Sequence, residues 1–454
     1  MINILIDDEL LEIFDLCRMD EVATSSHLPW KWHRLAHVCR TWRNIIFGSS
    51  LRLNLELLCT HGTPVRKNLR YLPALPIVID FPGYIKDCDE DNILAALEHP
   101  DRVHVLRLNV SYSLLKKMAT VTQKPFPALT LLWLESKQDR PMPVLPDAFL
   151  GGCAPRLQRI CLDGIPFPAI PTLLSSARDL IQVDLRMIPN AGYFSPGAMV
   201  ASVAVLPRLI SLSFGFGRDN AYPNRIRLPP ITRRAVLPAL IHLNFDGLFE
   251  YFEDFVAQID TPQVDLFGIG ISDDDEDVDF QIPQFCKFID RSEKLQQSRF
   301  RRAILRITPL NAVIELSGQS SFTLSVQDEG ISQVLNQIRG TLSSVDRLFI
   351  SQQYTEYEEL GDRIEWLGLL RPFTAVKALS VREEISYHVA PALNNVAGAR
   401  AAEVLPALEL LFLENRQVTS VKKFIAARRN VGRPVTFINN GREFRERLEP
   451  SVTE

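Results

Sequence analysis

The chain has 454 residues, of which 46% are hydrophobic and 23% charged, and its net charge is −4 at pH 7. This composition excludes a mainly disordered chain, and the length exceeds that of one ordinary compact domain. Because the charges nearly balance, no overall positive field favours nucleic acid or an anionic membrane as a partner.

The seven cysteines form no Cys-x-x-Cys pair, so we expect reduced, mostly buried thiols. They predict no disulfide framework and no structural zinc, and nothing else in the sequence points to a cofactor. The first nine residues turn acidic at once, unlike a signal peptide, and the longest apolar stretch, 198–206, is too short to span a bilayer. We expect a soluble protein of the cytoplasm or nucleus.

The first fifty residues predict two or three short amphipathic helices. Leu10, Ile13, Phe14 and Cys17 recur at helical spacing, and Asp7 or Asp8 can cap the helix. A second apolar stripe follows at Leu35, Val38, Cys39, Trp42, Ile45 and Ile46. So few residues bury little surface, which favours completion of the core by a partner.

Two blocks in this segment carry a family resemblance. Residues 5–16 read LIDDELLEIFDL and residues 37–45 read HVCRTWRNI. They resemble the two blocks of an F-box, Leu-Pro-x-x-hydrophobic-Leu-x-x-Ile-Phe and Val-Cys-basic-x-Trp-x-x-hydrophobic, in the same order. Ile6 stands where the family usually has proline, and 19–31 lengthen the gap between the blocks. Beyond the box, 47–79 resemble fungal F-box proteins with divergent leucine-rich repeats.

The resemblance implies a defined role. F-box proteins dock onto the Skp adaptor of a cullin-based ubiquitin ligase, and the rest of the chain holds a protein substrate. Carried over by position, the adaptor-facing residues are Leu5, Ile6, Leu10, Leu11, Ile13, Phe14, Val38 and Trp42. Some of these only hold the box together, and for Phe14, Cys39 and Trp42 core packing is as strongly expected as direct contact.

A short pattern, aliphatic-x-x-aliphatic-x-aliphatic, recurs along most of the chain and is typical of leucine-rich repeats. In six of ten cases proline stands two residues before the pattern. Because proline cannot continue a helix and is tolerated at the start of a strand, it marks the passage from helix to strand. The ten occurrences are 103–108, 129–134, 157–162, 180–185, 209–214, 240–245, 264–269, 345–350, 376–381 and 408–413.

With helical spacing between the patterns, we predict an α/β fold. It is an irregular leucine-rich-repeat solenoid with a parallel concave sheet and outer helices, preceded by a small N-terminal α-helical F-box. The repeats lack the usual Asn or Cys at their ninth position. The expected parts are the F-box at 1–50, a linker and N-terminal cap at 51–100, the repeats at 101–430 and a C-terminal tail at 431–454.

One interval between patterns is 81 residues long. Within it, 271–330 form either degenerate repeats or an inserted antiparallel patch, because three β-like stretches lie close together. An acidic run at 273–279 lacks the glycine and the glutamate that an EF-hand needs, so we expect a solvated loop. Arg428, Arg429 and the later arginines predict a solvated basic C-terminal region.

Alternation along the strands predicts which side chains face outward on the sheet. Mixed charges and aromatic groups suit a protein ligand, although a sheet face needs polar residues for solubility anyway. The candidate substrate-binding residues are Trp133, Arg159, Asp184, Arg186, His242, Asn244, Asp246, Arg347, Phe349 and Phe412.

No motif for nucleophilic, metal-dependent or nucleotide-dependent catalysis occurs, so we do not expect an enzyme. The best interpretation is the substrate-recognition subunit of a Skp–cullin–F-box ubiquitin ligase. The alternative is a non-enzymatic repeat scaffold whose degenerate F-box does not recruit the ligase. In both, the partners are proteins, and the substrate is not readable from the sequence.

Overall fold

A computed structural model describes residues 6–24, 32–50, 52–53, 55–60, 64–81, 87–136, 141–217, 233–271, 281–308, 311–326, 330–353, 364–396, 403–414 and 421–439. Leu5, the acidic run 273–279 and the arginines after 440 lie outside this part of the chain. The fold is α/β, and it divides into two compact units, Met1–Phe194 and Ser195–Glu454.

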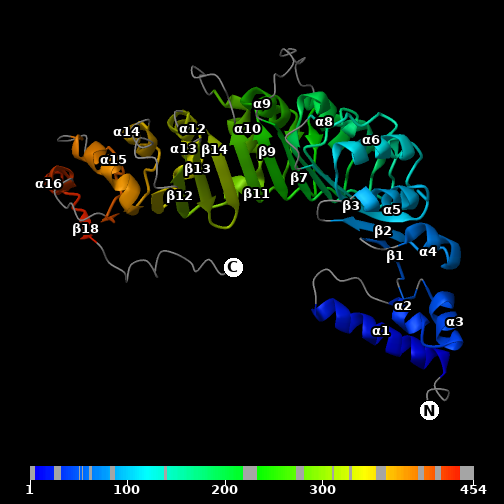
Figure 1. Cartoon of the computed structure of the whole chain (residues 1–454). Coiled ribbons are helices and arrows are strands. Elements are labelled where there is room, and N and C mark those ends of the chain that lie inside the picture. The colour runs from blue at the N-terminus through cyan, green and yellow to red at the C-terminus, as the bar shows by residue number, and fades with distance from the viewer. Residues whose placement is uncertain are drawn as a thin grey trace. The chain divides into compact units, whose positions relative to one another are not determined.

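The first unit begins with three helices and continues as a sheet of six parallel strands in chain order. The helices are α1 (Asp7–Thr24), α2 (Trp32–Ala36), α3 (Arg40–Gly48), α4 (Val65–Tyr71), α5 (Asp87–Leu97), α6 (Tyr112–Val121) and α7 (Ile170–Ser176). The strands are β1 (Leu57–Cys59), β2 (Ile77–Phe81), β3 (Val103–Asn109), β4 (Leu131–Glu135), β5 (Arg159–Asp163) and β6 (Gln182–Ile188). In Figure 1, α5 and α6 lie against one face of this sheet.

The second unit carries a mostly parallel sheet in the order β7-β9-β11-β14-β13-β12-β15-β16-β17-β18. Its strands are β7 (Ser211–Phe216), β9 (His242–Gly247), β11 (Leu266–Ile271), β12 (Arg302–Ile307), β13 (Ala312–Ser317), β14 (Ser321–Val326), β15 (Arg347–Gln352), β16 (Ala378–Val381), β17 (Leu410–Leu413) and β18 (Thr436–Asn439). A separate small pair joins β8 (Ala235–Val236) to β10 (Ile259–Asp260).

The helices of the second unit that lie beside β7–β15 cover one face of its sheet (Figure 1). They and the later helices are α8 (Pro196–Val203), α9 (Phe249–Ala257), α10 (Pro283–Arg291), α11 (Glu293–Gln297), α12 (Ile331–Gln337), α13 (Arg339–Leu342), α14 (Trp366–Leu370), α15 (Glu383–Asn394) and α16 (Lys422–Asn430). We call the opposite face of each sheet its open face.

All ten strands predicted from the repeated pattern are present, and a recurring turn explains their prolines. The N–H of Leu129 donates to the carbonyl of Phe126 at 3.2 Å, with Pro127 at the second position of this four-residue turn. The same bond precedes β5, β7 and β17, from Leu157, Leu209 and Leu408. Proline is favoured at that position because its ring already holds the required φ, so the repeats mark a turn as well as a strand start.

The long interval contains an inserted antiparallel patch, the second of the two alternatives. Strand β13 pairs antiparallel with both β12 and β14. The outer two strands then pair parallel with β15 and β11, so the insertion restores the strand direction of the sheet. Asp265, before β11, accepts hydrogen bonds from Ser320 Oγ at 2.5 Å and pairs with Lys294 Nζ at 3.0 Å, which ties the insertion to the sheet.

Aromatic side chains fill the space between the sheet and helices of the second unit. Phe267 on β11 stacks on Phe285 of α10 and on Phe322 of β14, each with ring centroids 5.6 Å apart. Buried Glu253 of α9 caps α10, because its carboxylate accepts the backbone N–H groups of Gln284 and Phe285, both at 2.8 Å. These N–H groups have no partner within the helix.

Three expectations differ from the structure at the ends of the sheets. Strands β1 and β2 extend the first sheet into the range expected to be a linker and cap. Strand β18 pairs with β17 inside the range expected to be a tail. Arg428, expected in a solvated basic region, is only 1% exposed, and its Nη2 donates to the carbonyls of Pro406 and Leu408. The pattern missed these strands because each departs from the repeat.

The cysteines are also less buried than expected among the described residues. Cys59 and Cys161 are buried, Cys153 and Cys286 are half-buried, and Cys17 and Cys39 are exposed. The exposed pair lies in the N-terminal helices.

Candidate interaction surfaces

The acidic residues of the first turn stabilise the N-terminus of helix α1. The cap position is Ile6, not Asp7 or Asp8 as expected, and the Glu9 side chain accepts the Ile6 N–H at 3.1 Å. A glutamate at the third helical position commonly makes this return bond. The negative charges of Asp7, Asp8 and Glu9 also complement the positive end of the helix dipole.

The three N-terminal helices share a small core. Phe14 of α1 is fully buried, and its ring meets that of Trp42 on α3 edge to face with centroids 4.9 Å apart. Leu10, Leu11 and Ile46 are buried with it. Of the eight predicted adaptor-facing residues, Leu10, Leu11 and Phe14 therefore hold the helices together, and Trp42 is half-buried.

The remaining apolar side chains of this helical part face solvent. Ile6 is 63% exposed, Ile13 40% and Val38 58%, and all three are in the predicted set. Leu16, one turn beyond Ile13 on α1, is 66% exposed and was not predicted. Its spacing of three residues from Ile13 was the signal available in the sequence. The apolar arc of α1 is thus wider than the part that α3 covers.

Contacts also join the helices to the first strand. The Trp32 indole N–H donates to the Glu56 carbonyl at 3.0 Å, just before β1. Arg43 Nε donates to the carbonyl of Ala36 at 2.9 Å and satisfies the end of α2. The start of α1, the end of α2 and the small core of these helices are therefore satisfied within the chain, while Ile6, Ile13, Leu16 and Val38 stay exposed.

On the open face of the first sheet, side chains form rows across the strands. Arg107, Trp133, Cys161 and Asp184 are register partners on β3–β6. The Arg107 guanidinium lies 5.2 Å from the centroid of the Trp133 ring, a distance typical of a cation–π contact. Trp133 is half-buried and Arg159, in the next row, is exposed.

Asp184 and Arg186 are paired with each other. Arg186 donates through Nε to Oδ1 at 2.9 Å and through Nη2 to Oδ2 at 2.5 Å, and Asp184 is buried. Residues two apart on a strand share a face, so the sequence could have predicted this pair. Burial and the negative charge of Asp184 raise the pKa of the neighbouring Cys161 thiol to about 12, so the thiol stays protonated.

The polar side chains of β9 lie against two glycines of the neighbouring strand β11. His242, Asn244 and Asp246 are exposed, as the alternation along the strand predicted. A methyl group at Gly268 would come within 2.2 Å of Asn244 Oδ1, and one at Gly270 within 2.9 Å of Asp246 Oδ1. The glycines of β11 are therefore required by the side chains that fold over them from the neighbouring strand.

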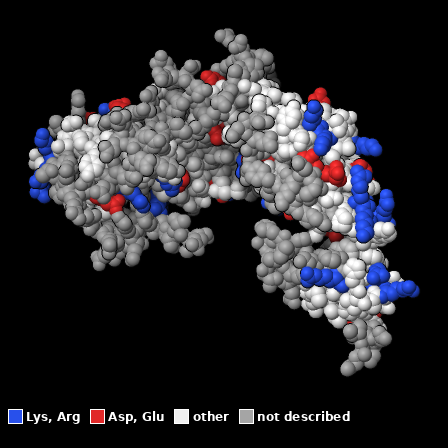
Figure 2. Space-filling model, viewed as in Figure 1, with Lys and Arg blue, Asp and Glu red and all other residues white. Residues whose placement is uncertain are grey.

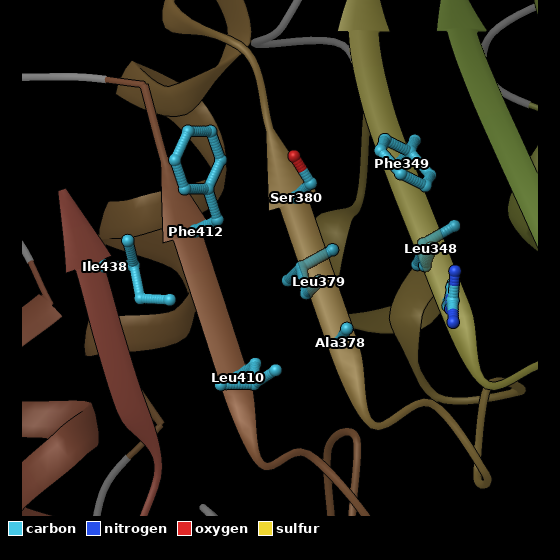
Figure 3. Close-up of a pocket in the computed structure, with 9 residues that line it drawn as sticks. Leu348, Phe349, Ala378, Leu379, Ser380, Leu410, Phe412 and Ile438 are labelled. Atoms are coloured by element: carbon cyan, nitrogen blue, oxygen red, sulfur yellow. The ribbon is translucent and has the colours of Figure 1, made fainter. Parts of the chain in front are cut away.

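An apolar pocket lies on the open face of β15–β18. Figure 3 shows Phe349 on β15 and Phe412 on β17 on the two sides of Ser380 of β16, in one row across the sheet. The complete lining is Arg347, Leu348, Phe349, Ala378, Leu379, Ser380, Leu410, Phe412 and Ile438. Of these, the sequence predicted Arg347, Phe349 and Phe412 as outward-facing. Arg347 is exposed and Phe349 is half-buried, but Phe412 is only 8% exposed and is therefore not an open surface residue. The sequence missed Ser380, which is not a residue type that marks interfaces, and Ile438, which lies outside the repeated pattern.

Charge is mixed over the surface. Figure 2 shows basic and acidic side chains interspersed on the face in view, and its basic groups include those over the helices of the first unit. There Arg66 of α4 pairs with Glu98 at 3.2 Å. No cluster of three His, Cys, Asp or Glu side chains suited to a metal ion occurs in the described part of the chain. None of the helices within it has both the length and the apolar character needed to cross a membrane.

Comparison with protein-family models finds no matching family, and a search of the curated proteins finds no significant match.

Proposed function

We propose that this protein is the substrate-recognition subunit of a Skp–cullin–F-box ubiquitin ligase. Its N-terminal helices dock onto a Skp-family adaptor, and its leucine-rich-repeat sheets hold a protein substrate on their open faces. It carries no catalytic chemistry of its own in this role. The observation that supports the proposal is the exposed apolar set Ile6, Ile13, Leu16 and Val38, on helices whose sequence resembles an F-box.

The physical argument is one of burial. Exposed large apolar residues gathered in so small a helical segment are a common mark of a protein interface. Covering a side chain such as Ile13 or Leu16 stabilises a complex by about 1.5–3 kcal/mol. Each of the four exposed side chains can therefore contribute a water-excluding contact to an interface.

The test is capture of the chain by a recombinant Skp-family adaptor. The double variant Ile13→Asp/Val38→Asp changes only exposed side chains, so we expect it to stay folded and to lose capture at least tenfold. Val236→Asp is the matched control, because Val236 on β8 is 56% exposed and lies in the other unit. Circular dichroism spectra verify the fold of each variant.

Absence of capture from folded wild-type protein would contradict the ligase role. The alternative, a non-enzymatic repeat scaffold, would then stand, and the helices would serve as an internal cap through Trp32 and Glu56. Equal loss in the double variant and in Val236→Asp would mean that the exposed apolar set is not the adaptor site.

A further inference from the structure

A groove separates two pairs of helices in the second unit. Residues of α10 and α11 form one wall, and residues of α12 and α13, with the segment before β15, form the other. Figure 1 shows α10, α12 and α13 over the same face of the sheet. The groove, which we call the α10–α13 groove, has a volume of about 540 Å³. Ligand sites usually measure ~300–1,000 Å³, so a ligand has room here.

Hydrogen bonds join the two walls of the α10–α13 groove at two places. On the α12 side, Gln337 accepts the Ile282 N–H through Oε1 at 2.9 Å, and its carbonyl accepts the Cys286 thiol at 3.7 Å. Close to the strands, the Ser344 hydroxyl donates to the carbonyl of Phe300 at 3.0 Å. The walls are therefore fixed against each other, which lowers the cost of ordering the site when a ligand binds.

Two arginines lie on opposite walls of the groove. Arg299 and Arg339 both line it and are exposed. Within the described part of the chain, no hydrogen bond or ion pair engages either guanidinium. Arg299 directly precedes Phe300, and Arg339 lies five residues before Ser344, the partner of Phe300. Because arginine side chains are long, both guanidinium groups can reach a ligand in this part of the groove.

The other charges of the groove leave the arginines in excess. Asp290 of α10 is the acidic residue of the described lining, and it is exposed. Burial, with the charges of Glu253 and Asp290, raises the pKa of the Cys286 thiol, so this thiol stays protonated and adds no negative charge. Two positive groups against one negative group favour an anionic ligand on the arginine side.

The number of available donors favours phosphate over a carboxylate. The two oxygens of a carboxylate match the fork of a single guanidinium. A phosphorylated side chain carries a charge of about −1.5 to −2 at pH 7 and three acceptor oxygens, so it can engage two arginines at once. Thr341, on the wall of Arg339, places a hydroxyl in the same lining.

We infer that the α10–α13 groove binds a phosphorylated serine or threonine of a partner protein, with the phosphate held between Arg299 and Arg339. Gln296 and Gly340 of the lining are exposed, and a methyl group at Gly340 would meet no atom within 4 Å, so a chain segment can enter. The inference goes beyond the proposed function, because this site lies among the helices and does not require the adaptor.

The probe is a fluorescein-labelled peptide, Gly-Ala-Gly-phosphoserine-Gly-Ala-Gly, titrated with the full-length chain and followed by fluorescence anisotropy. We expect the matched peptide with unmodified serine to bind at least tenfold more weakly. Equal binding of the two peptides overturns the inference, as does the absence of binding by the phosphopeptide.

Competition identifies the source of the phosphate. The unlabelled phosphopeptide should displace the probe at a concentration at least fivefold below that of inorganic phosphate, because its flanking residues also cover the groove. Displacement by inorganic phosphate at the same concentration would assign the site to free phosphate compounds and overturn the assignment to a partner protein.

Variants of the chain locate the site. Arg299→Glu and Arg339→Glu should each weaken phosphopeptide binding at least tenfold, and Gly340→Glu should do so without removing either arginine. Arg371→Glu, an exposed position that follows α14, reverses one charge outside the groove and should leave binding unchanged. Circular dichroism spectra verify the fold of each variant. Binding that survives all three groove variants overturns the inference, as does an equal loss in Arg371→Glu.

Adaptor capture separates this inference from the proposed function. Arg299→Glu should be captured by the adaptor as well as wild type, and Ile13→Asp/Val38→Asp should bind the phosphopeptide as well as wild type. Loss of phosphopeptide binding in the folded Ile13→Asp/Val38→Asp variant would contradict the placement of the site in the groove. Wild-type protein that is captured but does not bind the phosphopeptide would overturn this inference and leave the ligase role in place.

Discussion

At the residue scale, a few buried or half-buried polar side chains join elements that are distant in the sequence. Glu253 caps α10 by accepting two backbone N–H groups of its first turn. Asn394 caps α16 in the same way, because its Oδ1 accepts the N–H groups of Lys423 and Phe424. Glu90 of α5 accepts hydrogen bonds from Ser113 Oγ at 2.9 Å and Lys117 Nζ at 2.6 Å, both on α6. Each carboxylate or amide thus fixes one helix against its neighbour.

Glu253→Ala leaves two helix N–H groups without an acceptor. We expect a loss of about 1–3 kcal/mol in the free energy of unfolding, because an unsatisfied buried donor loses its hydration without compensation. Urea denaturation of the full chain measures it. Glu253→Gln keeps an oxygen acceptor and should lose less, and equal losses in the two variants would argue against capping as the cause.

Glu90 makes stability depend on pH. Burial raises the pKa of its carboxyl, but the hydrogen bonds and charge of Lys117 and the bonds from the serines prevail and lower it below its ordinary value. A lowered pKa in the folded state gives stability that is complete above the unfolded pKa of about 4.3 and is lost as pH falls through the lower, folded value. Wild type should exceed Glu90→Gln in unfolding free energy at pH 7, with a difference that shrinks below pH 4.

The thiols should differ in reactivity. Cys161 is buried with its pKa raised to about 12, whereas Cys17 and Cys39 are exposed. Since the thiolate is the nucleophile, iodoacetamide at pH 8 should modify Cys17 and Cys39 and spare Cys161 in the native protein. Peptide mass spectrometry measures the modification, and denatured protein supplies the control in which all three react. Rapid labelling of native Cys161 would contradict its placement.

At the element scale, the sequence predicted those strands that follow the repeated pattern, since inward aliphatics and the preceding proline each have a physical cause. It could not predict β1, β2 and β18, whose flanking residues break the pattern, or choose between the two forms of the insertion. That choice depends on which strands pair across the chain, and short apolar runs do not encode pairing partners. At the candidate sites, alternation predicted the outward-facing side chains, but not the burial of Asp184 and Phe412 on that face. Helical spacing did not predict that Leu10 and Leu11 are buried, and for Phe14 it left core packing and adaptor contact equally expected.

The recurring proline turn can be tested at Pro127, whose ring sets the turn before β4. Pro127→Gly should lower the free energy of unfolding by about 1 kcal/mol, chiefly because glycine gives the unfolded chain more freedom. The folded structure and its far-ultraviolet circular dichroism should remain unchanged. Proline at the turn contributes nothing to the core, so a loss above about 3 kcal/mol would point to a different role.

At the scale of the whole molecule, sequence neighbours make most of the strand contacts within each unit, so damage should stay local. Phe267→Ala removes a ring that contacts Phe285, Phe288 and Phe322 and should destabilise its surroundings by about 3–5 kcal/mol. Hydrogen exchange should accelerate in α10, β11 and β14, while amides of β3–β5 in the first unit keep their wild-type rates. Uniform acceleration across both units would show that the chain unfolds as one cooperative body.

The antiparallel insertion also has a consequence for the order in which the chain folds. Strand pairing elsewhere closes short loops, as where Thr130 Oγ1 meets the His104 carbonyl across 26 residues. The hydrogen bond between Ser320 and Asp265 joins residues 55 positions apart. Strand β14 can pair with β11 only after β12 and β13, which precede it in the chain, have been synthesised. Because distant contacts form late, this joint is the expected kinetic bottleneck of the second unit, and the nascent chain exposes an unpaired β11 edge until β14 arrives.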